Sequence, residues 1–151
     1  MSPGNSQKSH ESIITFNDLY GIGPSMGPLP HLYAGFTWSQ SAWFLTREQM
    51  PSLRAAQPVV LFNAQGKDLF FEAKRSFDLR NMLLSALWDD NCEVLIEGWA
   101  KGAKRYAAPV ALRRNVSIGH QLAFSNVDRV SVITRGINVA IHAITVLVEG
   151  A

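Results

Sequence analysis

The feature that most constrains the fold is a succession of short apolar runs, each bounded by residues that form turns. No segment longer than about ten residues carries the apolar period of a helix. Many short strands without helices between them are typical of sandwiches and barrels, not of alternating strands and helices. The sequence therefore predicts an all-β fold, a two-sheet antiparallel β-sandwich of the jelly-roll kind. The runs span residues 12–16, 31–46, 58–62, 68–72, 76–79, 82–88, 92–99, 105–112, 116–124, 127–134 and 138–149.

The run at 92–99 has the alternation of a half-buried strand. Val94 and Ile96 fall on one face, whereas Glu97 and Trp99 fall on the other. Turn residues at 89–91 precede the run and residues 100–103 form the next turn, which predicts a hairpin with 105–112. Among the tryptophans we expect Trp99 to be the most exposed, because it shares its face with glutamate.

The chain has the size and composition of one folded domain. Its 151 residues are enough for a single hydrophobic core, and 47% of them are hydrophobic and 17% charged. We expect the polar residues 1–11 to form a flexible N-terminal arm and residues 12–151 to form a single β-sandwich domain. The first residues lack the apolar segment of a secretory signal, and no apolar run reaches the roughly 20 residues of a membrane span. We therefore expect a cytoplasmic protein with no membrane partner.

Charge and cysteine content exclude two further classes. The formal net charge is +2, and the basic residues occur as scattered pairs such as Lys104 with Arg105. Nucleic-acid binding requires basic side chains concentrated on one surface, so nucleic acid is not an expected partner. Cys92 is the single cysteine, which excludes a disulfide within the chain. Its strand context favours a small buried side chain over a reactive thiol.

Four segments occur in an order that resembles a known kind of domain. They are 14–19 (ITFNDL), 30–38 (PHLYAGFTW), 77–79 (FDL) and 84–90 (LSALWDD). Together they resemble a jelly-roll domain of uncharacterised fungal and bacterial proteins, whose members read I-T-F-D-D-L, P-x-x-Y-x-G-[FL]-x-W, F-D-[LF] and, in the last strand, F-x-L-D-N-L. That domain is similar to the galactose-binding-like carbohydrate modules. The resemblance implies a jelly roll with adjacent first and last strands and a sugar or another small molecule as ligand.

The chain departs from this pattern at the acidic positions. Where the pattern has two carboxylates after the first strand, this chain has Asn17 and Asp18, so one carboxylate is lost, and the Asp-Asn of the last strand is replaced by His142-Ala143. In related jelly rolls these acidic positions meet and can hold a structural calcium ion. Calcium prefers about six to eight oxygen ligands, for which an imidazole nitrogen is a poor substitute. We therefore expect no bound metal, and the sequence indicates no cofactor.

His142 and Asp18 are the candidate catalytic residues. His142 lies in an otherwise apolar strand, at the position where the resemblance places an acid. It either faces a pocket and acts as a general acid or base with Asp18 as its orienting carboxylate, or it is a structural histidine bonded to the backbone. Asp18 equally fits a strand-end aspartate that bonds its own backbone.

Aromatic residues supply the candidate ligand contacts, because aromatic rings stack on sugar faces and line apolar pockets. The candidate ligand-binding residues are Tyr33, Trp38, Trp43, Trp99 and His31. Core packing explains the aromatic residues equally well.

Three functions stay open. The first is a domain that binds a carbohydrate or another small molecule. The second is a cofactor-free cyclase or isomerase of secondary metabolism that uses His142, and the third is an interaction domain that forms a homodimer.

Overall fold

The computed structural model describes residues 9–21, 23–49 and 57–149. Within them the chain consists mostly of β-strands, with three short 3-10 helices, η2 (Asn17–Leu19), η3 (Arg47–Gln49) and η4 (Ala64–Gly66). No helix in these ranges is long and apolar enough to cross a membrane. The strands are β1 (Ser9–Ile14), β2 (Met26–Pro28), β3 (Leu32–Tyr33), β4 (Phe36–Trp38), β5 (Ala42–Thr46), β6 (Val59–Asn63), β7 (Leu69–Ala86), β8 (Cys92–Ala100), β9 (Ala103–Leu112), β10 (Ile118–Ile133) and β11 (Val139–Glu149).

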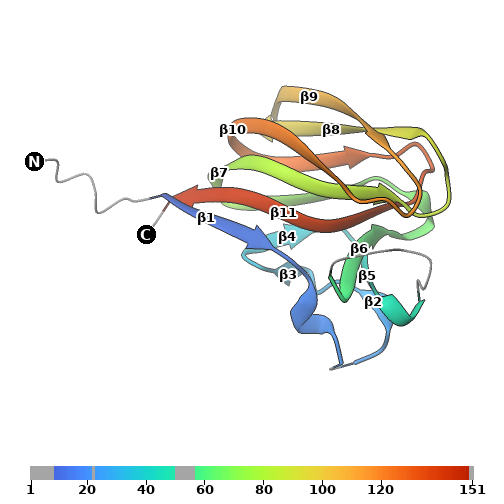
Figure 1. Cartoon of the computed structure of the whole chain (residues 1–151). Helices are drawn as coiled ribbons and strands as arrows, with labels where there is room; N and C mark the ends of the chain where they lie inside the picture. The colour runs from blue at the N-terminus through green and yellow to red at the C-terminus, as the bar shows by residue number, and fades with distance from the viewer. Residues whose placement is uncertain (1–8, 22, 50–56, 150–151) are drawn as a thin grey trace, which may run out of the picture.

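The strands form one antiparallel sheet that folds over into two layers. Its order is β2-β5-β6-β11-β7-β10-β8-β9, with β1 paired to β11 and β4 paired to both β3 and β7. Figure 1 shows β8 and β9 at one side of the molecule and β2 and β5 at the other. One layer contains β8, β9, β3 and β4, and the other contains β1, β2, β5, β6 and β11.

Strands β7 and β10 belong to both layers because each is long and bent. The first half of β7 pairs with β4 and with the second half of β10, for example Glu72 with Arg129. Its second half pairs with β11 and with the first half of β10, for example Met82 with His120. The register between β7 and β10 shifts three times between Gln121 and Arg129, as β-bulges do when they bend a strand within a sheet.

The apolar pattern of the sequence predicts each of these two strands as separate, shorter strands. The predicted breaks follow residues 72 and 79 in β7 and residue 124 in β10, where polar residues interrupt the apolar runs. In the structure these residues form bends and bulges, and the chain stays in the sheet through them. The all-β sandwich is confirmed, but its two layers belong to one hydrogen-bonded sheet and not to two separate sheets.

The two layers enclose one main hydrophobic core. Phe71, Ile96 and Val130 enter it from one layer and Leu79 and Ile144 from the other, and all five are fully buried. Their strands alternate buried and exposed residues in this region, which leaves the intervening side chains on the outside of the sandwich.

The first and last strands lie side by side, as the resemblance implied. β1 pairs with β11 from Ser9 opposite Glu149 to Ile14 opposite Ile144. The first strand thus begins at Ser9, before the predicted residue 12, because it gains backbone hydrogen bonds to β11 that apolar patterning does not reveal. Residues 9–11 of the predicted flexible arm therefore belong to the sheet, and residues 1–8 lie outside the described residues.

Candidate functional site

One outward sheet face carries a tryptophan among charged side chains. On β8, Val94 and Ile96 are buried in the core, so Glu97 and Trp99 face outward as the sequence predicts. The neighbouring strand β10 places Arg129 directly opposite Trp99. We call this surface the Trp99 face and define it by Phe70, Glu72, Glu97, Trp99, Lys104, Arg129 and Ser131.

Arg129 is fixed in the middle of the Trp99 face. It lies opposite Trp99 of β8 and also opposite Glu72 of β7, so the three residues form one row across three strands. Its Nη1 atom lies 3.8 Å from a carboxylate oxygen of Glu72. Its guanidinium carbon lies 3.9 Å from the centre of the Phe70 ring, within the range of a cation–π contact. The guanidinium group is therefore held from two directions.

Glu97 fixes the positions of Trp99 and Lys104 on the Trp99 face. Its carboxylate accepts a hydrogen bond from the indole Nε1 of Trp99 at 3.3 Å and forms an ion pair with Lys104 Nζ at 3.2 Å. Glu97 is only 9% exposed, although it points away from the main core. Partly exposed ion pairs contribute little stability one by one. Their consequence here is that the indole ring, the carboxylate and the ammonium group are kept in one arrangement.

These side chains border an open hollow of about 530 Å³. Small-molecule sites commonly measure about 300–1,000 Å³ and combine apolar surface with a few polar groups. The hollow offers an indole ring together with carboxylate oxygens and guanidinium donors. It is lined by Glu72, Glu97, Trp99, Gly102, Asp128, Arg129, Ser131 and Ile133.

The other aromatic candidates lie elsewhere. Trp38 is fully buried and donates its Nε1 hydrogen to the carbonyl of Tyr33 at 2.8 Å, so it packs the core and cannot contact a ligand. Trp43 is half-buried on β5 and borders a separate hollow beside η4. His31 is exposed just before β3. The expected platform is thus not assembled from these residues, because their strands belong to different parts of the sandwich.

Exposure of the tryptophans also differs from the prediction. Trp88, in the connection between β7 and β8, is 65% exposed, whereas Trp99 is half-buried by its neighbours on the sheet. Trp99 lines the hollow on the Trp99 face, whereas Trp88 does not line it.

Tyr33 and Asp18 form a contact of their own. The Tyr33 hydroxyl donates a hydrogen bond to the Asp18 carboxylate, and the Tyr33 ring stacks on Phe16 with 5.7 Å between ring centres. Burial, together with the neighbouring Asp18 carboxylate, raises the pKa of Tyr33 above its ordinary value. Both residues border an open hollow between η2 and the β3–β4 hairpin.

The expected acid–base pair is not formed. His142 is 1% exposed, and its Nε2 atom shares a hydrogen bond of 2.9 Å with Ser85 Oγ. Its Nδ1 atom finds no hydrogen-bond partner among the described residues. Burial lowers the pKa of His142 to about 4. Because His142 is closed off from solvent and Asp18 is exposed and bonded to Tyr33, the two do not assemble the site that the cyclase or isomerase alternative requires.

Metal binding and thiol chemistry find no support among the described residues. Within them, no group of three or more His, Cys, Asp or Glu side chains is arranged to hold a metal ion. Cys92 is half-buried rather than fully buried, and burial raises the pKa of its thiol, which disfavours the nucleophilic thiolate.

Sequence reasoning missed Phe70, Glu72 and Arg129. Each alternates with a core residue, as Arg129 does with Val130, so an outward position could have been inferred from the pattern. Their position opposite Trp99 depends on which strands pair, and local patterning does not specify that pairing.

No protein-family model matches this chain, and no curated protein matches it. Among solved structures, the K1 adhesin domain of Lys-gingipain from Porphyromonas gingivalis W83 aligns with a TM-score of 0.53 at 8% identity, covering 93% of this chain and 99% of that one. The chain has the β-sandwich fold of such domains. The family 29 carbohydrate-binding module CBM29_1 from Piromyces equi aligns with a TM-score of 0.52 at 11% identity, covering 93% and 91%. The agarase AgWH50C aligns with a TM-score of 0.50 at 8% identity over 85% of this chain but only 25% of the agarase.

Proposed function

We propose that this protein binds a carbohydrate on the Trp99 face. The observation that carries the proposal is the indole ring of Trp99, held by Glu97 and flanked by Arg129 above an open hollow. An indole ring provides the flat apolar surface on which the C–H face of a sugar ring stacks. Carboxylate and guanidinium groups beside it provide acceptors and paired donors for sugar hydroxyls. The similarity in fold to a carbohydrate-binding module supports this choice of ligand.

A neutral sugar fits the balance of charge better than an acidic one. The hollow contains the carboxylates of Glu72, Glu97 and Asp128, and Arg129 is the cation that lines it. A uronic acid or sulfated sugar would therefore meet more negative than positive groups. Because the polar side chains already hold one another, a neutral sugar would lose little affinity to ordering them.

The test is affinity electrophoresis and calorimetric titration against a panel of soluble neutral polysaccharides, including β-glucan, mannan, xylan and galactan. Trp99→Ala should weaken binding of the retained polysaccharide by at least about tenfold, as expected when a central aromatic contact is removed. Arg129→Lys keeps the charge but loses the planar donor pair, and should weaken it less.

Trp88→Ala is the matched control, because Trp88 is the more exposed tryptophan and lies outside the Trp99 face. It should leave affinity unchanged. Retention of no polysaccharide in the panel, or loss of binding in Trp88→Ala with none in Trp99→Ala, would show that the Trp99 face is not a sugar site.

A further inference from the structure

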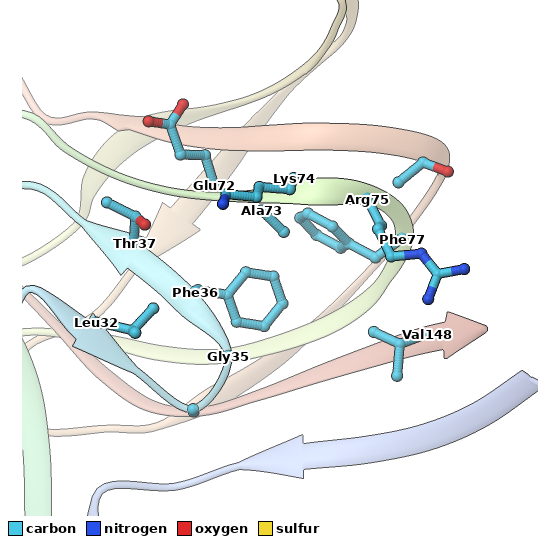
Figure 2. A pocket seen from close by; sticks show the side chains of 12 residues that line it. Leu32, Gly35, Phe36, Thr37, Glu72, Ala73, Lys74, Arg75, Phe77 and Val148 are labelled. Atoms are coloured by element: carbon cyan, nitrogen blue, oxygen red, sulfur yellow. The ribbon is translucent and has the colours of Figure 1, made fainter. Parts of the chain in front are cut away.

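A second, more apolar pocket opens where β7 passes from one layer to the other. It has a volume of about 530 Å³ and lies between the β3–β4 hairpin, the bend of β7 and the end of β11. Figure 2 shows the Phe36 and Phe77 rings at its centre, Leu32 and Thr37 on one side and Val148 on the other. Its lining is Leu32, Ala34, Gly35, Phe36, Thr37, Glu72, Ala73, Lys74, Arg75, Ser76, Phe77 and Val148.

The two phenylalanines form a fixed apolar wall. Phe36 and Phe77 are 4% and 3% exposed, and their ring centres lie 4.9 Å apart at an interplanar angle of 79°. Phe36 makes a similar edge-to-face contact with the buried Phe71, at 5.3 Å and 86°. Such contacts hold aromatic rings in defined positions. The two rings therefore belong to the packed core, and only a small part of their surface is exposed at the pocket.

The hairpin beside the pocket is equally well defined. Ala34 and Gly35 connect β3 to β4 with φ angles of 54° and 83°, as in the tight two-residue turns of hairpins. Leu32, which starts this hairpin, remains 70% exposed at the pocket rim. An apolar ligand that extends out of the pocket would cover this side chain.

Two cations and one carboxylate border the pocket. Lys74 and Arg75 are exposed at the bend of β7, and no ion pair among the described side chains includes either of them. Glu72 also borders the pocket, but its carboxylate is paired with Arg129 on the Trp99 face. In Figure 2 the Glu72 carboxylate points away from the two phenylalanine rings, and the Arg75 guanidinium group lies on the side of Val148. Two cations that form no ion pair with another described side chain therefore lie beside the apolar wall.

We propose that this pocket binds a small amphipathic anion, with an aromatic body against Phe36 and Phe77 and a carboxylate near Lys74 and Arg75. The apolar body loses water-exposed surface inside the pocket, and the carboxylate stays at the rim, which carries the two exposed cations. The site shares Glu72 with the Trp99 face, but Phe36, Phe77, Lys74 and Arg75 lie outside that face.

Phenylbutyrate is a suitable probe, and its uncharged amide, phenylbutyramide, is the matched ligand control. Titration followed by backbone amide chemical shifts should show saturable binding of phenylbutyrate, with shifts at Ala73 and Phe77. The double substitution Lys74→Gln with Arg75→Gln should weaken phenylbutyrate binding by about fivefold, because each exposed cation contributes modestly. It should leave phenylbutyramide binding unchanged, and Arg105→Gln, an exposed charge outside the pocket, should change neither.

A third variant tests the apolar wall. Ala73→Phe places a larger side chain in the pocket and should abolish binding of both ligands, whereas Trp99→Ala should leave phenylbutyrate binding intact. Absence of saturable phenylbutyrate binding would overturn the proposal, as would equal weakening of the acid and the amide in the double variant. Because the Trp99 and the Lys74/Arg75 variants affect different ligands, failure here is distinguishable from failure of the carbohydrate proposal.

Discussion

Ser85 Oγ and His142 Nε2 lie 2.9 Å apart, and both side chains are withdrawn from solvent. The hydrogen bond fixes the imidazole ring between β7 and β11, and burial favours its neutral form. In the unfolded chain the same histidine regains its ordinary pKa of about 6.5, compared with about 4 in the fold.

This difference predicts a loss of stability in mild acid. Since the unfolded chain binds the proton more readily, the contribution of His142 is fully present above pH 6.5 and is lost as pH falls toward 4. Between pH 7 and pH 5 the free energy of unfolding should fall by about 2 kcal/mol on account of His142. Urea unfolding at the two pH values measures this change.

His142→Gln is the informative variant, because it cannot gain a proton in this range. It should remove most of that pH dependence. Burial also lowers the pKa of half-buried His120, so a smaller dependence of the same sign should remain. An undiminished dependence in His142→Gln would contradict the role assigned to His142.

The raised pKa of Tyr33 predicts a loss of stability in alkali. Burial raises its pKa in the folded state above the ordinary value of 10, so its contribution is present below pH 10 and is lost as pH rises beyond it. Spectrophotometric titration should show one tyrosine that ionises only at higher pH. Tyr33→Phe should eliminate that late step. If the late step persists in Tyr33→Phe, another residue is responsible for it.

Asn63 is a fully bonded polar group in the interior. Its Nδ2 atom donates to the carbonyls of Lys67 and Ile137 at 2.9 and 2.8 Å, and its Oδ1 atom accepts from the Val139 amide at 2.7 Å. Asn63→Ala leaves these buried groups without partners and should cost about 2–3 kcal/mol of unfolding free energy. Asn63→Asp should cost more, because a carboxylate would face two carbonyl oxygens.

Chemical denaturation of these variants provides the measurement, with Gln121→Ala as a control on an exposed side chain of β10. The control should lie within about 0.5 kcal/mol of the parent protein. If Asn63→Asp proved as stable as the parent, the three hydrogen bonds would not be important for the fold.

Alanine substitutions at Gly66 and Gly102 distinguish the cost of backbone strain from the cost of a steric clash. Both have positive φ angles, of 69° and 77°. A Cβ atom at Gly66 would lie 2.5 Å from the carbonyl oxygen of Gly136, whereas one at Gly102 would meet nothing within 4 Å. Gly102→Ala should therefore cost about 1 kcal/mol from strain alone, and Gly66→Ala clearly more. Thermal melting of the two variants compares them directly, and equal losses would contradict the predicted clash.

The sequence was sufficient to predict the class of fold, but not that two of its strands belong to both layers of the sandwich. Alternation at Val94 and Ile96 identified one buried face correctly, because side-chain direction along a strand is a local property. The continuity of β7 through Lys74 and Arg75 could not be predicted in the same way. These residues resemble a strand end in the sequence, and only the pairing with β4, β10 and β11 shows that the strand continues.

The candidate site was predicted only in part for the same reason. Trp99 and Glu97 were recognised as an outward pair on one strand, but Arg129 and Glu72 come from strands distant in the sequence. For Trp38 and His142 the sequence left a site role and a core role open, because an aromatic or titratable residue in an apolar run gives the same pattern whether it lines a pocket or fills the core. Burial, which depends on the whole fold, separates these cases.

The pairing of Ser9 with Glu149 also determines how this domain would respond to mechanical force. Because β1 and β11 are antiparallel, a load applied across Ser9 and Glu149 would act at one end of their shared ladder. It would then peel the strands apart one hydrogen-bonded pair at a time, like a zipper, instead of straining the whole ladder at once as in shear. In that loading geometry β1 is the element expected to detach first, while the strands that carry the Trp99 face and the Phe36–Phe77 pocket remain in the sheet.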